Sequence, residues 1–121
     1  MRVRRLSRVV TRIFDGALRP LGITPAQLSL LVIIELQGPV APSVVGRFLD
    51  IEKSTLSRNL RLMNEAGWIH EKAEGQEKRL ELTVSGRKIL AEAYPLWRAA
   101  QKKASNTLGT KATVALNSSD K

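Results

Sequence analysis

The sequence predicts a mainly α-helical fold with one small antiparallel β-hairpin. Over most of the chain, apolar residues recur at three- and four-residue spacing, as on one face of a helix. Residues 68–72 and 79–82 instead show the alternation and bulk of strands, and the polar stretch between them contains Gly75. The 121 residues suffice for one domain but not comfortably for two, and 43% of them are hydrophobic. We therefore expect a single domain, residues 1–121, with a real core.

The first two helices have clear boundaries. Residues 3–18 carry apolar residues at helical spacing with arginines between them, and Pro20 and Gly22 close this segment. The next helix starts with Thr24 as a cap, Pro25 at the first helical position and Gln27 where a capping box requires Glu or Gln. It is apolar on nearly every side, so we expect it in the buried centre of the domain.

Two short helices and the hairpin follow. Residues 42–49 predict a third helix, residues 50–52 a tight connection, and residues 53–66 a fourth helix that Gly67 stops. Residues 73–78 are polar, and we expect them to form the hairpin loop. A helix then runs from residue 84 past residue 100, bent at Pro95, and a weaker last helix is expected from Ser105 on.

Two short helices joined by a tight turn and followed by a hairpin are the parts of a winged helix-turn-helix. In the second helix of the pair, Leu56, Leu60 and Met63 share a packing face at 100° per residue. The opposite face is polar, carries no acid, and consists of Lys53, Ser54, Ser57, Arg58, Arg61 and Asn64. Arginine can bind guanine with two hydrogen bonds, and serine can bind a base edge or a phosphate. This pattern favours DNA reading over an ordinary solvated face, which usually mixes Glu with Lys.

The hairpin is a second candidate for DNA contact. Gln76, Lys78 and Arg79 could reach the minor groove or the DNA backbone. Glu74 and Glu77 lie among them and dilute the positive field, so a plain solvated turn is the alternative interpretation.

Composition favours a polyanionic partner and excludes several chemistries. The chain has 20 Lys and Arg against 11 Asp and Glu, a formal charge of +9. It has no cysteine, so disulfides and thiolate metal sites are excluded. His70 is the only histidine, and no carboxylate spacing suggests a catalytic pair. We expect no enzyme activity, no metal and no cofactor. With neither a signal peptide nor a membrane span predicted, we expect a soluble cytoplasmic protein.

The same residues resemble the MarR family of winged-helix regulators. The resemblance covers nearly the whole chain and rests on Lys53-Ser54-Thr55-Leu56-Ser57-Arg58, on Ala66-Gly67-Trp68-Ile69, on Leu82-Thr83-x-x-Gly86, and on the segment from Leu18 to Gln27. It implies that Ser54, Thr55, Ser57, Arg58 and Arg61 face the major groove and that Ser43 binds phosphate. The family's wing carries an Asp-x-Arg motif that, counted back from Leu82-Thr83, falls on Glu74-Gly75-Gln76, with Gln76 where the arginine is expected. The alternative alignment places the motif on Glu77-Lys78-Arg79 and would need a shortened wing.

The resemblance also implies a homodimer that binds short palindromes and blocks transcription. In many members a small aromatic or phenolic ligand releases the DNA, and Tyr94 and Trp97 are the candidates to line such a pocket, although interface packing would also explain them. Dimerisation has independent support. The helix over 84–104 would be about 30 Å long at 1.5 Å per residue, too long for so small a lobe to cover. We expect Leu6, Val10, Ile13, Leu108 and Leu116 at the interface.

The sequence therefore predicts a DNA-binding lobe over residues 23–83 and a helical dimerisation region over residues 1–22 and 84–121. The partners expected are double-stranded DNA and a second copy of the chain. Two alternatives stay open at this stage. One is a winged-helix module that binds protein or coats DNA without sequence preference. The other is binding to a membrane surface through the arginine-rich helix 3–18, whose apolar face is better explained by dimerisation.

Overall fold

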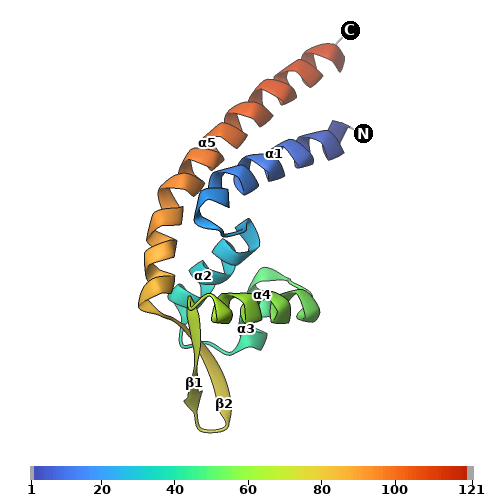
Figure 1. Cartoon of the computed structure of the whole chain (residues 1–121). Helices are drawn as coiled ribbons and strands as arrows, with labels where there is room; N and C mark the ends of the chain where they lie inside the picture. The colour runs from blue at the N-terminus through green and yellow to red at the C-terminus, as the bar shows by residue number, and fades with distance from the viewer. Residues whose placement is uncertain (1, 120–121) are drawn as a thin grey trace.

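The computed structural model describes residues 2–119, with side chains described over 8–73 and 75–109. The helices in chain order are α1 (Arg2–Leu18), α2 (Pro25–Gln37), α3 (Pro42–Leu49), α4 (Lys53–Glu65) and α5 (Val84–Ser119). A lobe built from α2, α3, α4 and a β-hairpin lies below an arm in which α1 runs beside α5 (Figure 1). Helix α5 connects the two, and both chain ends lie on the same side of the molecule (Figure 1). This layout agrees with the predicted mainly α-helical fold with one hairpin.

The first two helices begin and end as their sequence predicts. Helix α1 spans Arg2–Leu18, and a short 3₁₀ turn, Arg19–Leu21, leads to Gly22 in the left-handed region at φ +69°. Helix α2 spans Pro25–Gln37. The Thr24 hydroxyl accepts a hydrogen bond from the Gln27 N–H at 3.2 Å, and the Gln27 side chain accepts one from the Thr24 N–H at 3.1 Å. The predicted capping box is confirmed.

The helix-turn-helix consists of α3, Pro42–Leu49, and α4, Lys53–Glu65. Asp50 ends α3 in the left-handed region at φ 51°, and the Ile51 N–H donates to the Gly46 carbonyl at 3.2 Å. This turn is tight enough to let Leu56 of α4 contact Gly46, where an added Cβ would lie 3.0 Å from the leucine Cδ2. The predicted three-residue connection is confirmed, and α4 ends just before Gly67, which has φ +80°.

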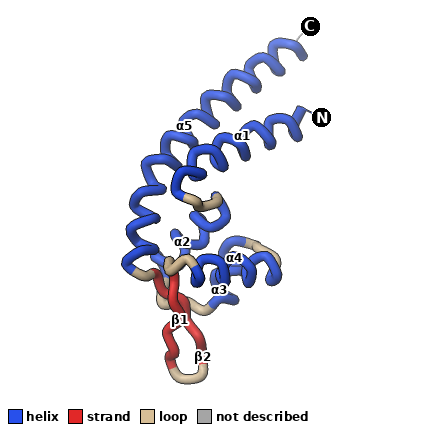
Figure 2. The backbone as a smooth tube through the Cα atoms, in the orientation of Figure 1, coloured by secondary structure: helices blue, strands red, loops and turns tan. Residues whose placement is uncertain are grey.

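The hairpin is longer and its turn tighter than predicted. Strand β1 spans Ile69–Glu74, strand β2 spans Glu77–Leu82, and their register pairs Ile69 with Leu82 and Glu74 with Glu77. The prediction of a polar loop over residues 73–78 was therefore wrong, because only Gly75 and Gln76 form the turn. Glycine suits this turn since its φ is +64°. Figure 2 shows the two strands projecting from the bottom of the lobe.

The last helix is continuous. Helix α5 spans Val84–Ser119 and includes Pro95, so the expectation of a separate weak helix from Ser105 was wrong. Figure 1 shows α5 curving on its way up the arm, in agreement with the bend expected from a proline inside a helix.

The core lies where α2, α4, the hairpin and α5 meet. Its fully buried members include Leu30, Leu31, Ile34, Met63 and Leu80. Helix α2 is thus the centre of the lobe, as predicted, but not on every side: Leu36 is 70% exposed and Val32 is 37% exposed.

Over the described residues, no single helix is both long enough and apolar enough to cross a membrane. The segments Arg8–Leu21 and Pro25–Gln37 reach the required length and hydropathy only when they are taken together, and the chain bends by 71° between them.

Candidate nucleic-acid interface

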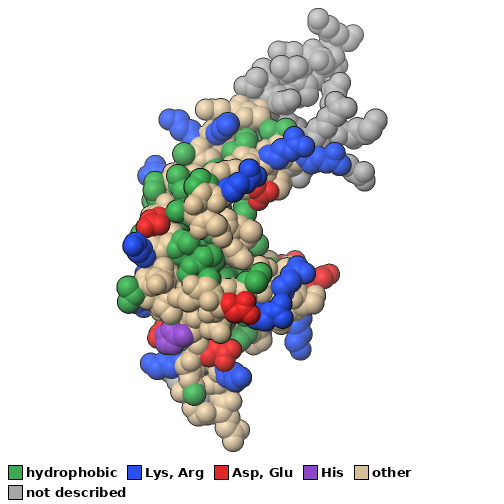
Figure 3. Space-filling model, viewed as in Figure 1, with side chains coloured by type: hydrophobic (Ala, Val, Ile, Leu, Met, Phe, Trp, Pro, Cys, Tyr) green, Lys and Arg blue, Asp and Glu red, His purple; other side chains and the backbone are tan. Residues whose placement is uncertain are grey.

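Helix α4 presents its polar face to solvent. Leu56 and Met63 are buried against the lobe, and Leu60 packs half-buried beside them. The exposed side chains on α4 include all six of the predicted polar face: Lys53, Ser54, Ser57, Arg58, Arg61 and Asn64. On the face shown in Figure 3, Lys and Arg side chains gather at the outer end of the lobe and along α1. The predicted separation of a packing face from a polar face is present.

Two residues of α4 differ from the simple two-face description. Thr55 is half-buried, and its carbonyl accepts a hydrogen bond from the Asn59 side chain at 3.1 Å. Leu62 is 44% exposed and follows Arg61 on the surface, so the exposed part of α4 is not entirely polar. A leucine at this position can contact a thymine methyl group, whereas it cannot form hydrogen bonds.

The start of α4 is available to an anion. The helix begins after Glu52, and no side chain caps its first turn among the described residues. The N–H groups of a helix's first turn have no partner within the helix, and the helix dipole places partial positive charge there. Lys53 adds a full positive charge at the same point, and the exposed Glu52 before it adds a negative one, so the backbone N–H groups are the main attraction for an anion. Ser43, predicted to bind phosphate, is exposed in the first turn of α3.

Two of the wing's permanent cations are paired with its own acids. The Lys78 amine lies 3.6 Å from a Glu71 carboxylate oxygen, and the Arg79 guanidinium lies 3.4 Å from that of Glu77. Gln76 is exposed at the hairpin tip. Strands β1 and β2 together hold four acids against three permanent cations: Glu71, Glu74, Glu77 and Glu81 against Lys72, Lys78 and Arg79. The acids of the two strands therefore outnumber their permanent cations by one, so the wing carries no net positive charge, in contrast to the acid-free face of α4.

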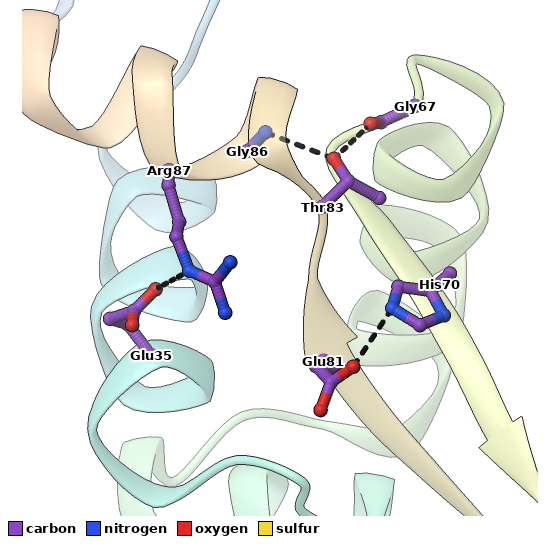
Figure 4. Close-up of polar contacts among 7 residues, drawn as sticks. All are labelled: Glu35, Gly67, His70, Glu81, Thr83, Gly86 and Arg87. Carbon is purple, nitrogen blue, oxygen red and sulfur yellow. Dashed lines mark hydrogen bonds and ion pairs between the residues drawn. The ribbon is translucent and has the colours of Figure 1, made fainter.

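His70 lies on the wing, directly across the hairpin from Glu81. Its Nε2 is 3.0 Å from a Glu81 carboxylate oxygen, and the register pairs the two residues (Figure 4). Over the described residues, no group of three or more His, Cys, Asp or Glu side chains could hold a metal ion. His70 thus has a structural partner and takes part in no cluster typical of metal binding.

The predicted interface residues lie on the arm. Val10 and Ile13 are half-buried on α1, where α1 packs along α5, and Leu108 of α5 is 39% exposed. The side chains of Leu6 and Leu116 lie outside the described ones. Apolar surface therefore remains open on the arm of a single chain.

The two residues predicted to line an effector pocket are separated. Tyr94 is exposed and lines a groove of about 530 Å³ with Glu35, Arg87, Leu90 and Ala91. The Arg98 guanidinium lies 5.9 Å from the centre of the tyrosine ring. Trp97 is half-buried and packs against the hydrophobic core instead. Sequence reasoning missed Arg87 and Glu35, whose contact joins residues 52 positions apart.

The junction between lobe and arm is held by hydrogen bonds that the sequence alone did not reveal. The Thr83 hydroxyl donates to the Gly67 carbonyl and accepts from the Gly86 N–H at 3.0 Å (Figure 4). The Thr83 N–H donates to the Trp68 carbonyl at 3.0 Å. Close by, the Arg87 Nε lies 3.3 Å from a Glu35 carboxylate oxygen. Thr83 thus connects the end of α4 to the start of α5.

A helix-turn-helix followed by a two-stranded wing, with the second helix presenting a polar face, defines a winged-helix protein of the kind that reads DNA. Comparison with known proteins agrees with that class. A model of the MarR family matches residues 21–80. The chain is 35% identical to the M. tuberculosis transcriptional regulator MosR in a crystal structure with DNA, covering 93% of this chain and 88% of that one, with a TM-score of 0.76. The chain belongs to the MarR family of winged-helix regulators.

Two further comparisons are informative. The chain is 26% identical over 82 residues to the uncharacterized HTH-type transcriptional regulator YwoH of Bacillus subtilis. That match spans 68% of this chain and 59% of the relative's length. A M. tuberculosis MarR family protein in complex with salicylic acid has the same fold, with a TM-score of 0.72 at 21% identity over 95% of this chain and 87% of that one.

Proposed function

We propose that this chain is a homodimeric transcriptional repressor that binds a pseudo-palindromic DNA operator and is not an enzyme. The observation that carries the proposal is the exposed face of α4, where Lys53, Arg58 and Arg61 stand among serines with no acid between them. Arginine and serine at these positions supply hydrogen-bond donors and acceptors to base edges in a major groove. The free N–H groups at the start of α4 supply a site for a phosphate.

The proposal names the DNA contacts residue by residue. Arg58 and Arg61 contact bases or phosphates, and Ser54 and Ser57 lie near the bases. Thr55 is assigned a smaller part because it is half-buried. Lys53 and Ser43 bind the DNA backbone. The likeness to MosR, whose crystal structure contains DNA, supports this assignment at the level of the family.

The arm is the part of the chain that we propose to pack against a two-fold partner. We propose that residues 1–22 and 84–121 form the dimerisation region and that residues 23–83 form the DNA-binding lobe. Val10, Ile13 and Leu108 are the described residues that would pack against the partner, together with Leu6 and Leu116. Two copies related by a two-fold axis would read an inverted repeat, with half-site centres about 34 Å apart, which is one turn of DNA.

The salt dependence of binding to a mixed-sequence DNA duplex tests the role of α4. The double variant Lys53→Gln/Arg61→Gln is expected to bind more weakly, and the slope of log K against log salt should flatten by about 0.9 for each phosphate contact removed. The matched control is the double variant Lys102→Gln/Lys103→Gln, which removes the same number of charges at exposed positions of α5 far along the chain from the lobe. An equal loss in both variants would contradict the assignment, because general charge rather than α4 would then carry the binding.

The wing is proposed to contribute little, because Lys78 and Arg79 are paired with acids and Gln76 lies at its tip. Gln76→Arg is expected to tighten DNA binding by about 3- to 10-fold and to steepen the salt slope by about 1, as a new cation reaches the minor groove or a phosphate. Gln76→Ala is the control and should leave affinity within about twofold. If Gln76→Ala cost as much as an α4 variant, the wing would be a principal contact and the proposal would fail on this point.

A small aromatic acid is the proposed effector. The groove is lined by Glu35, Arg87, Leu90, Ala91 and Tyr94, and the Arg87 guanidinium contacts Glu35 through its Nε. We propose that a carboxylate on an aromatic ring competes with Glu35 for this guanidinium while its ring packs against Leu90 and Tyr94. Salicylate is expected to raise the midpoint of thermal unfolding and to weaken DNA binding in the wild type but not in Arg87→Gln. Trp97 is not proposed as a ligand contact, because it packs on the core. If salicylate changed the midpoint of thermal unfolding and the DNA affinity equally in the wild type and in Arg87→Gln, this groove would not be the effector site.

A further inference from the structure

The Leu82-Thr83-x-x-Gly86 motif joins the lobe to the arm, and Thr83 is the point at which the two are tied. Its hydroxyl bonds to both sides of the junction: it accepts from the N–H of Gly86 in the first turn of α5 and donates to the carbonyl of Gly67, just beyond the end of α4 (Figure 4). Its backbone N–H also donates to the Trp68 carbonyl at 3.0 Å. One residue therefore holds the C-terminal end of α4 against the N-terminal end of α5.

An ordinary helix cap does not need all of these bonds. A capping side chain only accepts a hydrogen bond from an N–H of the first turn, which the bond from Gly86 already satisfies. The bond that the hydroxyl donates to Gly67 serves no purpose within α5. It spans 16 residues and joins the start of α5 to the segment just beyond α4.

The lobe itself is tied together near the same place. Val40 and Leu80 exchange two backbone hydrogen bonds, of 3.0 and 2.7 Å, which link the hairpin to the segment between α2 and α3. The ion pair between Arg87 and Glu35 adds a second contact between α5 and the lobe. The lobe is therefore held together internally, and its angle to the arm depends on the contacts at the junction.

A small rotation at this junction would move the DNA-facing end of α4 by a large distance. Helix α4 has 13 residues and is about 20 Å long. Its C-terminal end lies next to Gly67, which Thr83 contacts, so Lys53 and Ser54 lie at the opposite end of the helix. A rotation of the lobe by about 10° about the junction would move that end by about 3.5 Å, close to the 3.4 Å rise of one base pair.

We propose that Thr83 is a positioning residue that sets the distance between the two recognition helices and thereby the half-site spacing that the dimer accepts. This inference rests on the proposed function, because spacing has meaning only for a dimer that reads two half-sites. Thr83 touches no DNA in this proposal. It acts by holding α4 at a fixed angle to the arm through the bond to the Gly67 carbonyl.

Three substitutions separate the helix-capping bond to Gly86 from the bond to the Gly67 carbonyl. Thr83→Asp keeps a good acceptor for the Gly86 N–H but has no hydroxyl hydrogen to donate to Gly67. Thr83→Ser keeps both bonds. Thr83→Val keeps the shape and loses both. Each protein is tested as the full chain against a series of duplexes whose half-sites, taken from the sequence that the wild type selects, are moved apart or together one base pair at a time.

The wild type and Thr83→Ser are expected to prefer one spacing by about tenfold over its neighbours, a cost comparable to that of one mismatched base pair. Thr83→Asp should fold with unchanged helix content and bind a single half-site duplex as the wild type does, yet prefer no spacing by more than about twofold. Thr83→Val should also lose the preference, with some loss of thermal stability.

Three results would overturn the inference. The first is a Thr83→Asp protein with the same sharp spacing preference as the wild type. The second is a Thr83→Asp protein that does not fold, since the bond to Gly67 would then serve stability rather than position. The third is a Thr83→Asp protein whose affinity for a single half-site duplex falls by as large a factor as its preference for one spacing, since the substitution would then damage DNA reading itself. A wild type that selects no DNA sequence would contradict the proposed function, and it would also contradict this inference, which requires two half-sites.

Discussion

Replacing Arg58 by alanine is expected to weaken binding to the selected operator by about 1–3 kcal/mol, which is roughly a 5- to 150-fold rise in Kd. Arg58 is exposed on the face of α4 that carries no acid, near the middle of the helix. A guanidinium there can donate two parallel hydrogen bonds to the O6 and N7 atoms of guanine. Truncation removes these bonds and also leaves the base edge without a partner.

The loss should depend on sequence. If Arg58 reads a base, the variant should relax the preference at one position of each half-site and change affinity for mixed-sequence DNA much less. Arg58→Lys separates charge from geometry, because lysine keeps the charge without the planar pair of donors. Competition binding with single-base operator variants measures this. An Arg58→Ala protein with unchanged affinity and unchanged base preference would contradict the assignment.

The largest expected effect on stability comes from Gly86→Ala. An added Cβ at Gly86 would lie 2.0 Å from the Trp68 carbonyl oxygen and 2.9 Å from its carbonyl carbon. Both atoms belong to the backbone, so a side chain cannot swing aside, and α5 must move away from the lobe. The hydrogen bonds of Thr83 to Gly86 and Gly67 would be strained by that movement. We expect a loss of roughly 3 kcal/mol in the free energy of unfolding, at the upper end of the usual cost of overpacking.

Gly109→Ala is a matched control in the same helix. A Cβ at Gly109 meets no atom of the described residues within 4 Å. The substitution should therefore stabilise α5 by up to about 1 kcal/mol, the difference in helix propensity between glycine and alanine. Urea unfolding followed by circular dichroism measures both variants at the same chain concentration. If Gly86→Ala were no less stable than the wild type, the close packing of α5 on the Trp68 backbone would be wrong.

Local signals in the sequence identified the elements that carry the site. The capping box at Thr24 and the glycine after α4 depend only on neighbouring residues, so both could be read directly. The polar face of α4 followed from helical spacing, because the helix alternates packing and polar residues at a regular period. The winged helix-turn-helix was predicted from these elements and their order.

The errors have physical causes. The hairpin extends over charged residues with low strand propensity, such as Glu74, Glu77 and Lys78, and its pairing depends on cross-strand contacts that composition does not show. In α5, Asn, Thr and Ser after Ser105 cost a helix little, so the helix continues where a break was expected. The exposure of Val32 and Leu36 could not be read from a helix that is apolar nearly all round.

The junction was beyond sequence reasoning for a different reason. Leu82-Thr83-x-x-Gly86 was noticed as a motif, but its meaning lies in the contact of Thr83 with Gly67, 16 residues earlier, and in the approach of Gly86 to Trp68. The pair of Glu35 and Arg87 is separated by 52 residues. Such contacts arise only when the lobe is folded, so spacing along the chain gives no signal for them.

Selection of bound sequences from a random pool of DNA duplexes tests the central claim most directly. The account predicts that the full-length chain enriches an inverted repeat whose half-site centres are about one turn of DNA apart. It also predicts that Arg58→Ala enriches the same spacing with a relaxed base at one position of each half-site. Recovery of no common sequence, with an affinity that follows salt concentration alone, would contradict it and would favour a protein that coats DNA without reading it.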